Sequence, residues 1–153
     1  MDIRRIDARI AVSPQIDPAD IPAIKAAGFT AIVNNRPDGE EAAQPSGDAI
    51  RAAAEDAGLA YTAIPVTHAG FSHPQVAAMI DAIAQANGPV LAYCRSGTRS
   101  CNLWALAQAG LGEDHDTLVE HGAAAGYDLN GLRPLMDAVS PDRNDDNRSG
   151  GEQ

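Results

Sequence analysis

Short apolar runs alternate with segments that carry helix signals along almost the whole chain. Apolar runs of this length, bounded by glycine, proline or asparagine, are typical of buried strands. Strands are predicted at 8–12, 30–34, 59–66 and 90–93, and helices at 18–27, 48–57, 74–87, 98–109, 116–124 and 132–139. The alternation indicates an α/β fold with a mainly parallel sheet of four to five strands, flanked by helices on both faces.

The length and composition fit one domain with a single core. The chain has 153 residues, and 44% of them are hydrophobic, whereas aromatic residues make up only 4%. A core built mainly from Ala, Ile, Leu and Val is therefore expected, in a single domain of ordinary size. We assign this domain to residues 1–139. Residues 140–153 are polar and lack apolar periodicity, so a disordered tail is predicted there.

The formal net charge of −10 argues against two classes of binding partner. An acidic protein opposes general binding to nucleic acids and anionic membranes, so neither is expected as a partner. The N-terminal residues contain no apolar signal-peptide core, and no apolar run approaches the roughly 18 to 20 residues that span a bilayer. Only two cysteines are present, which fits a reducing compartment. We therefore expect a cytoplasmic protein.

One strand-to-helix turn carries an unusual set of reactive and anion-binding side chains. It follows the predicted strand at 90–93 and leads into the predicted helix at 98–109. Its residues are, in order, Cys94, Arg95, Ser96, Gly97, Thr98, Arg99 and Ser100. Active sites of parallel α/β sheets lie at the carboxyl ends of strands, and free N–H groups at the start of a helix bind anions. The turn therefore predicts an anion-binding loop around a nucleophilic cysteine.

The residue types suggest a role for each member of this loop. Cys94 and Arg99 are the predicted catalytic residues, because a thiol beside arginines at a helix N-terminus reacts as the thiolate and a guanidinium binds oxyanions. Substrate binding is predicted for Arg95, Ser96, Gly97, Thr98 and Ser100, and the Ser100 hydroxyl can also donate to the sulfur. A lone cysteine at a strand end is at least as often a small buried residue, but the surrounding set favours the reactive interpretation.

The chain resembles two known groups of proteins. The loop from Cys94 to Ser100 is similar to the active loop of rhodanese sulfurtransferases. Residues 3–139 as a whole resemble the phosphatase-like domain of beta-lactamase hydrolase-like proteins. The second resemblance rests on Ser-Pro-Gln at 13–15, Asn-Asn-Arg-Pro-Asp-Gly-Glu at 34–40, Ile-Pro-Val at 64–66 and Ala-Gly-Tyr-Asp-Leu at 125–129. It implies a cysteine-phosphatase-like fold, similar to that of dual-specificity protein phosphatases. Some members of that family are fused to a sulfur dioxygenase of metallo-β-lactamase type, which suggests such an enzyme as a partner.

Three features favour sulfur transfer over phosphoester hydrolysis. Cysteine phosphatases of this fold have five residues between cysteine and arginine, whereas Arg95 to Thr98 are four, the length seen in rhodaneses. They usually have histidine before the nucleophile, where this chain has Tyr93. They also use an aspartic acid to protonate the leaving group. The corresponding loop, at 67–73, contains no Asp or Glu, so His68 or His73 would have to replace that acid.

We therefore expect a rhodanese-type sulfurtransferase that carries sulfane sulfur as a Cys94 persulfide. Its partners would be a small anionic sulfur donor, such as thiosulfate or a persulfide, and a thiol acceptor. No cofactor and no metal are expected. The alternative is a cysteine-dependent phosphatase of the dual-specificity type, which is a hydrolase. A second alternative is a non-catalytic module that binds an anion or a phosphoprotein.

Three further residues have two interpretations each. Cys101 is either a small apolar core residue, which we favour, or a partner that forms a disulfide with oxidised Cys94. Arg36 either helps to bind the anion or forms an ion pair with Glu40 or Glu41. Trp104 is more often a core residue than a substrate platform.

Overall fold

The computed structural model describes residues 1–141 and contains a five-stranded sheet with the strand order β1-β2-β5-β3-β4. The strands are β1 (Arg4–Arg5), β2 (Ile10–Ser13), β3 (Ala31–Asn34), β4 (Ala60–Ala63) and β5 (Val90–Tyr93). Strand β1 runs antiparallel to β2, and the other three pairings are parallel. The prediction of an α/β domain with a mainly parallel sheet of four to five strands is confirmed.

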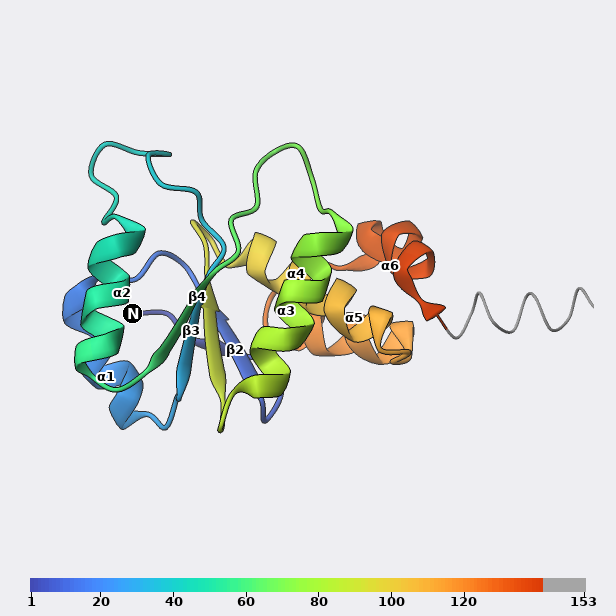
Figure 1. The fold of residues 1–153 in the computed structure, drawn as a ribbon. Helices are drawn as coiled ribbons and strands as arrows, with labels where there is room; N and C mark the ends of the chain where they lie inside the picture. Colours follow the sequence, from blue (N-terminus) through green and yellow to red (C-terminus); the bar gives the residue numbers. More distant parts are fainter. Residues whose placement is uncertain (142–153) are drawn as a thin grey trace, which may run out of the picture.

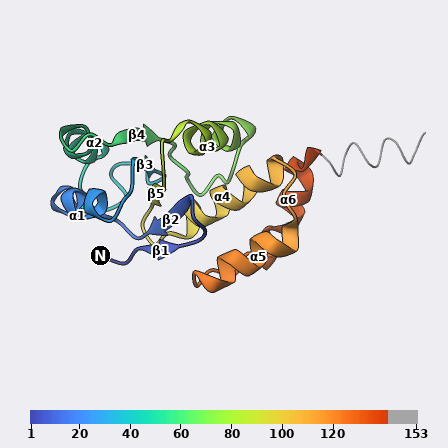
Figure 2. The ribbon, with the colours of Figure 1, turned by 90° about the horizontal axis from the view of Figure 1, so that it is seen from below.

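Helices cover both faces of the sheet (Figure 1). They are η1 (Pro18–Asp20), α1 (Ile21–Ala26), α2 (Gly47–Asp56), α3 (His73–Gln85), α4 (Thr98–Gly110), α5 (His115–Ala124), η2 (Asn130–Leu132) and α6 (Arg133–Val139). Helices α1 and α2 lie on one face, and α3 and α4 lie on the other, with α5 and α6 packed outside α4 (Figure 2). Within residues 1–141, no helix is long and apolar enough to cross a membrane.

Side chains of the central strands alternate between two apolar cores. On β5, Leu91 and Tyr93 pack with α1 and α2, whereas Val90 and Ala92 face the larger core around α4. The alternation follows from the two-residue period of a strand, and burial on both faces explains why β5 is apolar throughout. Helix α4 packs against the sheet, α3, α5 and α6, so most of its side chains are buried, including Trp104. The interpretation of Trp104 as a core residue therefore holds.

The register of the parallel strands brings three strand ends into line. Ser13 of β2 and Asn34 of β3 both pair with Tyr93 at the end of β5. Strand β5 lies between its two parallel neighbours, so the residue that follows it, Cys94, lies at the middle of this sheet edge. The loops that leave β2, β3 and β4 reach the same edge, where they contribute Gln15, Arg36 and Glu40, and the Val66 carbonyl.

Helix starts were predicted better than strand limits. Ser46 caps α2 by accepting a 3.1 Å hydrogen bond from the Ala49 N–H, as its residue type and position indicate. The predicted strand at 59–66 has regular pairing only at Ala60–Ala63. It lies at the sheet edge beside β3 alone, and beyond Ala63 the Ile64 and Val66 N–H groups still donate to the neighbouring chain, to the Asn34 and Asn35 carbonyls at 2.8 and 2.9 Å.

Two differences concern the ends of the chain. The two-residue strand β1 was not predicted, because two arginines show neither apolar periodicity nor a run of β-branched residues. The predicted disordered tail begins at Ser140, but this residue is buried where it ends α6. The remainder of that tail, residues 142–153, lies outside the described residues.

Candidate active site

Cys94 lies directly after β5 at the base of a tight turn. Its side chain is buried, and its Sγ accepts a 3.1 Å hydrogen bond from the Gly97 N–H. Gly97 precedes α4 with φ of +92°, in the left-handed region that glycine adopts without strain. This conformation turns the backbone N–H toward the sulfur, where it stabilises negative charge on a thiolate.

The turn is also fixed to the neighbouring strand β2. The Cys94 N–H donates to the Ser13 carbonyl at 3.4 Å, and the Gln15 N–H donates to the Arg95 carbonyl at 3.3 Å. On the other side, the Cys101 N–H donates to the Gly97 carbonyl at 2.9 Å and begins the hydrogen-bond ladder of α4. Cys94 is therefore held by backbone contacts on both flanks of the loop, as a preorganised nucleophile requires.

Arg99 is held in place by one carboxylate and one backbone carbonyl. Its Nη1 donates to Glu40 Oε2 at 2.7 Å and to the Val66 carbonyl at 2.8 Å, and its Nη2 donates to Glu40 Oε1 at 2.9 Å. The hydrogen bond with Glu40 raises the pKa of Arg99, and the nearby Cys94 sulfur adds to this shift. Arg99 therefore stays cationic beside the Cys94 sulfur.

Glu40 links Arg99 to a second, buried arginine. Arg36 is only 3% exposed; its Nε donates to Glu40 Oε1 at 2.9 Å and its Nη2 to Glu41 Oε1 at 2.7 Å. Its Nη1 donates to Gln15 at 3.0 Å. The ion-pair interpretation of Arg36 is therefore the one the structure displays. Hydrogen bonding to Arg99 lowers the pKa of Glu40 from 4.5 to about 2, against an opposing effect of burial, so this carboxylate is ionised at neutral pH.

The other predicted loop residues face in different directions. Arg95 is largely exposed and pairs with Glu41 at 3.3 Å. Ser96 donates to Thr98 through their hydroxyls at 3.0 Å, and both side chains lie at the exposed mouth of the loop. The Ser100 hydroxyl donates to Asn35 Oδ1 at 2.7 Å rather than to the sulfur, so the expected donation to Cys94 is wrong for this structure. The reason is that Asn35, at the end of β3, is buried directly against the start of α4.

Two residues of the site were not predicted to contact the loop. Glu40 is 59 positions before Arg99 in the chain, and only the course of the loop between β3 and α2 brings them together. Tyr127 follows α5, and its hydroxyl donates to the Ser96 carbonyl at 3.1 Å. Each belongs to a segment that carried the family resemblance, and Glu40 was otherwise expected only as a possible ion-pair partner of Arg36.

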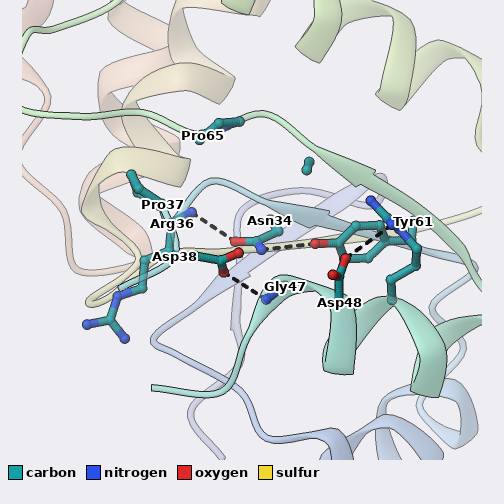
Figure 3. Close-up of a pocket in the computed structure, with 10 residues that line it drawn as sticks. Asn34, Arg36, Pro37, Asp38, Gly47, Asp48, Tyr61 and Pro65 are labelled. Carbon is teal, nitrogen blue, oxygen red and sulfur yellow. Dashed lines mark hydrogen bonds and ion pairs between the residues drawn. The ribbon is translucent and has the colours of Figure 1, made fainter. Parts of the chain in front are cut away.

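A small polar pocket lies beside this cluster, at the ends of β3 and β4 (Figure 3). It has a volume of about 120 Å³ and is lined by Asn34, Arg36, Pro37, Asp38, Gly47, Asp48, Arg51, Tyr61, Ala63 and Pro65. Asn34 donates to the Tyr61 hydroxyl at 3.0 Å, and Asp38 accepts from the Gly47 N–H at 2.8 Å. These contacts fix the loop that carries Glu40 and Glu41, and so they support the arginine cluster indirectly.

The second cysteine and the histidines do not join the site. Cys101 is fully buried in the core around α4, and burial raises its pKa to about 12, so it behaves as the small apolar residue that we favoured. His68 and His73 are exposed. Among residues 1–141, no group of three or more His, Cys, Asp or Glu side chains is arranged to hold a metal ion.

Comparisons with solved structures support a phosphatase-like fold. A phosphatase candidate of Neisseria meningitidis Z2491 (nma1982) is 36% identical, with a TM-score of 0.79 over 91% of this chain and 99% of that one. Tk-PTP in its active form has a TM-score of 0.70 at 19% identity, over 90% of this chain and 95% of that one, and this likeness concerns the fold alone. The Neisseria protein, described as a phosphatase candidate, fits the phosphatase alternative better than the expected sulfurtransferase.

Comparisons with curated sequences identify the family. Beta-lactamase hydrolase-like proteins of Agrobacterium fabrum and Xylella fastidiosa are 37% and 40% identical over 82% and 84% of this chain. The chain spans less than a third of their length, 29% and 30% respectively. Residues 2–111 match the sequence profile of one domain family. The chain therefore belongs to the family described as the phosphatase-like domain of beta-lactamase hydrolase-like proteins.

Proposed function

We propose that this chain is a cysteine-dependent phosphatase that hydrolyses phosphate monoesters through a phosphocysteine intermediate. The observation that carries the proposal is a hydrogen-bond donor and a fixed cation beside the same sulfur. Cys94 Sγ accepts a hydrogen bond from the Gly97 N–H, and the Arg99 guanidinium is fixed beside it by Glu40 and the Val66 carbonyl. A thiolate nucleophile with a preorganised cation is what phosphoryl transfer to sulfur needs.

In the first step, the Cys94 thiolate attacks phosphorus. An S–P bond forms, the P–O bond to the leaving group breaks, and that oxygen leaves with the bonding electron pair. Arg99 stabilises negative charge on the phosphoryl oxygens, and the loop N–H groups add partial positive charge at the same place. Glu40 orients Arg99 and does not itself contact the phosphoryl group.

In the second step, water attacks the phosphocysteine. An O–P bond forms, the S–P bond breaks, and inorganic phosphate leaves while Cys94 returns to the thiolate. The water loses one proton to solvent or to a phosphate oxygen. The Gly97 N–H again stabilises the departing sulfur, as it did the attacking one.

The described part of the site provides no carboxylic acid at the position expected for protonating the leaving group. The loop between β4 and α3 lacks Asp and Glu, and Glu40 is ionised because its pKa lies near 2. Leaving groups that depart without a proton are therefore favoured. We expect aryl phosphates to be cleaved much faster than alkyl phosphates.

The test is an assay of aryl phosphate hydrolysis by the wild type, Cys94→Ser and the control Cys101→Ala. Cys94→Ser is expected to lose activity by about a thousandfold or more, because a hydroxyl is a far weaker nucleophile at neutral pH. Cys101→Ala removes the other, buried thiol and should retain activity. Mass spectrometry of quenched wild type should detect one phosphoryl group on Cys94. Phosphate release that is equal in the wild type and Cys94→Ser would refute the proposal.

Sulfur transfer remains a second candidate, because only four residues separate Cys94 from Arg99 and because its leaving groups need no acid. In that reaction the Cys94 thiolate would take the sulfane sulfur of thiosulfate, release sulfite, and pass the sulfur to a thiolate or cyanide. The same three proteins, incubated with thiosulfate and then cyanide, distinguish the candidates. Thiocyanate formation that depends on Cys94, without phosphate release from aryl phosphates, would favour sulfur transfer.

A further inference from the structure

One peptide group connects Tyr127 to the sulfur of Cys94. The Tyr127 hydroxyl donates to the Ser96 carbonyl at 3.1 Å, and the N–H of the same peptide unit, which belongs to Gly97, donates to Cys94 Sγ at 3.1 Å. The carbonyl and the N–H of a trans peptide lie in one plane and point in opposite directions. A contact that fixes the carbonyl therefore fixes the direction of the N–H.

The close approach of Tyr127 depends on the glycine. A Cβ placed on Gly97 would lie 2.1 Å from the Tyr127 hydroxyl oxygen, far inside any van der Waals contact. The left-handed φ of +92° is a separate requirement for glycine at the same position. Gly97 thus serves the turn and also leaves room for the phenol behind it.

Tyr127 is itself held firmly. It is 8% exposed, and its N–H donates to the Gly122 carbonyl at 2.8 Å at the end of α5. The Arg4 guanidinium lies 5.3 Å from the ring centre, and Arg4 also donates to the Ala125 carbonyl at 3.3 Å. Burial raises the pKa of Tyr127, so the phenol keeps its proton and remains a donor at neutral pH.

We propose that Tyr127 is a positioning residue that acts through the Ser96–Gly97 peptide to hold the Gly97 N–H on the sulfur of Cys94. A hydrogen bond to the carbonyl polarises the peptide and strengthens the donation of its N–H. The effect on the nucleophile is to favour the thiolate, without any contact between the phenol and the substrate. The role serves the proposed phosphatase reaction and would serve any other reaction of the Cys94 thiolate.

The groups that face Cys94 come from three elements. Arg99 and Cys101 belong to α4, and Tyr127 follows α5; all three interact electrostatically with the Cys94 thiol. Glu40, on the loop after β3, acts on the sulfur through Arg99. Substitution of Tyr127 by phenylalanine leaves Arg99, Cys101 and Glu40 in place, so a changed titration of Cys94 can be assigned to the hydroxyl.

The experiment measures the rate of alkylation of Cys94 by iodoacetamide as a function of pH, in wild type and Tyr127→Phe. Cys101 is fully buried, and peptide mapping identifies the labelled residue. We expect the midpoint of the profile to rise by about half to one pH unit in Tyr127→Phe, with a roughly three- to tenfold slower reaction near neutral pH. Alkylation needs no phosphate substrate, so failure of the proposed phosphatase activity would not affect the result.

Thr30→Val is the matched control. The Thr30 hydroxyl also donates to a backbone carbonyl, that of Pro89 at 3.3 Å, but at the opposite end of β5 from Cys94. This variant should keep the wild-type midpoint. The amide signal of Gly97 in a ¹H–¹⁵N spectrum gives a second measurement, because its pH dependence should follow Cys94 in the wild type and shift in Tyr127→Phe. A Tyr127→Phe protein with the wild-type midpoint and an unchanged Gly97 signal would overturn the proposal.

Discussion

At the scale of single residues, the most consequential contact is the carboxylate that joins two arginines. Glu40 holds Arg99 through two hydrogen bonds of 2.7 and 2.9 Å, and it shares Oε1 with Arg36. In Glu40→Gln the paired charge is lost and only one oxygen remains to accept. We expect kcat/KM for an aryl phosphate to fall about tenfold or more, because small misplacements of a catalytic cation are costly.

Glu41→Gln is the control for this prediction. Glu41 contacts Arg36 and Arg95 but not Arg99, and its side chain is 49% exposed. Neutralising Glu41 leaves both hydrogen bonds between Glu40 and Arg99 in place, so less than about a threefold change in kcat/KM is expected. If Glu40→Gln were instead more active than the wild type, the Glu40 carboxylate would compete with the substrate anion for Arg99. The proposal that Glu40 positions Arg99 would then be wrong.

At the scale of elements, regular patterns were predictable and loop courses were not. The strand β5 and the helix α4 follow from apolar runs and glycine positions, and they place Cys94 correctly at a strand end. The contact between Glu40 and Arg99 depends on how residues 35–46 fold back over the sheet edge. That course is fixed by side-chain contacts such as Asp38 with the Gly47 N–H, which have no periodic signature in a sequence. The same limit applies to Tyr127.

The two ends of α4 give a prediction about one element. Gly97 combines a positive φ with the contact to Tyr127, whereas a Cβ on Gly110 would meet only ordinary contacts, at 3.6 Å from Ile80 and 3.8 Å from Val76. Gly97→Ala should lower the free energy of unfolding by about 1–3 kcal/mol or more and abolish most activity. Gly110→Ala should be neutral or stabilise by about 0.5 kcal/mol. Urea unfolding of both variants measures the contrast, and equal effects at the two positions would contradict it.

At the scale of the whole molecule, core and site are separated by geometry. The two apolar cores occupy the faces of the sheet, while the charged cluster lies along the edge where β2, β3, β4 and β5 end. Buried Arg36 belongs to this edge, so ionisation of the site and stability of the fold are coupled. Loss of the charge that partners a buried ion lowers the free energy of unfolding, because the remaining ion stays desolvated. The pH dependence of the free energy of unfolding should therefore follow the ionisation of the carboxylates that pair with Arg36 and Arg99.

The sign of this dependence follows from Glu40. Its pKa is about 2 in the folded protein, below the ordinary value of 4.5, so its stabilising contribution is fully present above about pH 4.5 and disappears as the pH falls toward 2. Because the carboxylate is partly exposed and solvent screens the pairs, we expect a contribution of about 1–2 kcal/mol. Urea unfolding at several pH values should show wild type more stable than Glu40→Gln by this amount near pH 6, and most of this difference should be lost by pH 2. The other carboxylates titrate in both proteins, so their contributions cancel in this difference. A difference between wild type and Glu40→Gln that stayed constant from pH 6 to pH 2 would mean that the charge of Glu40 does not stabilise the fold, and that Arg36 and Arg99 are held by the remaining contacts.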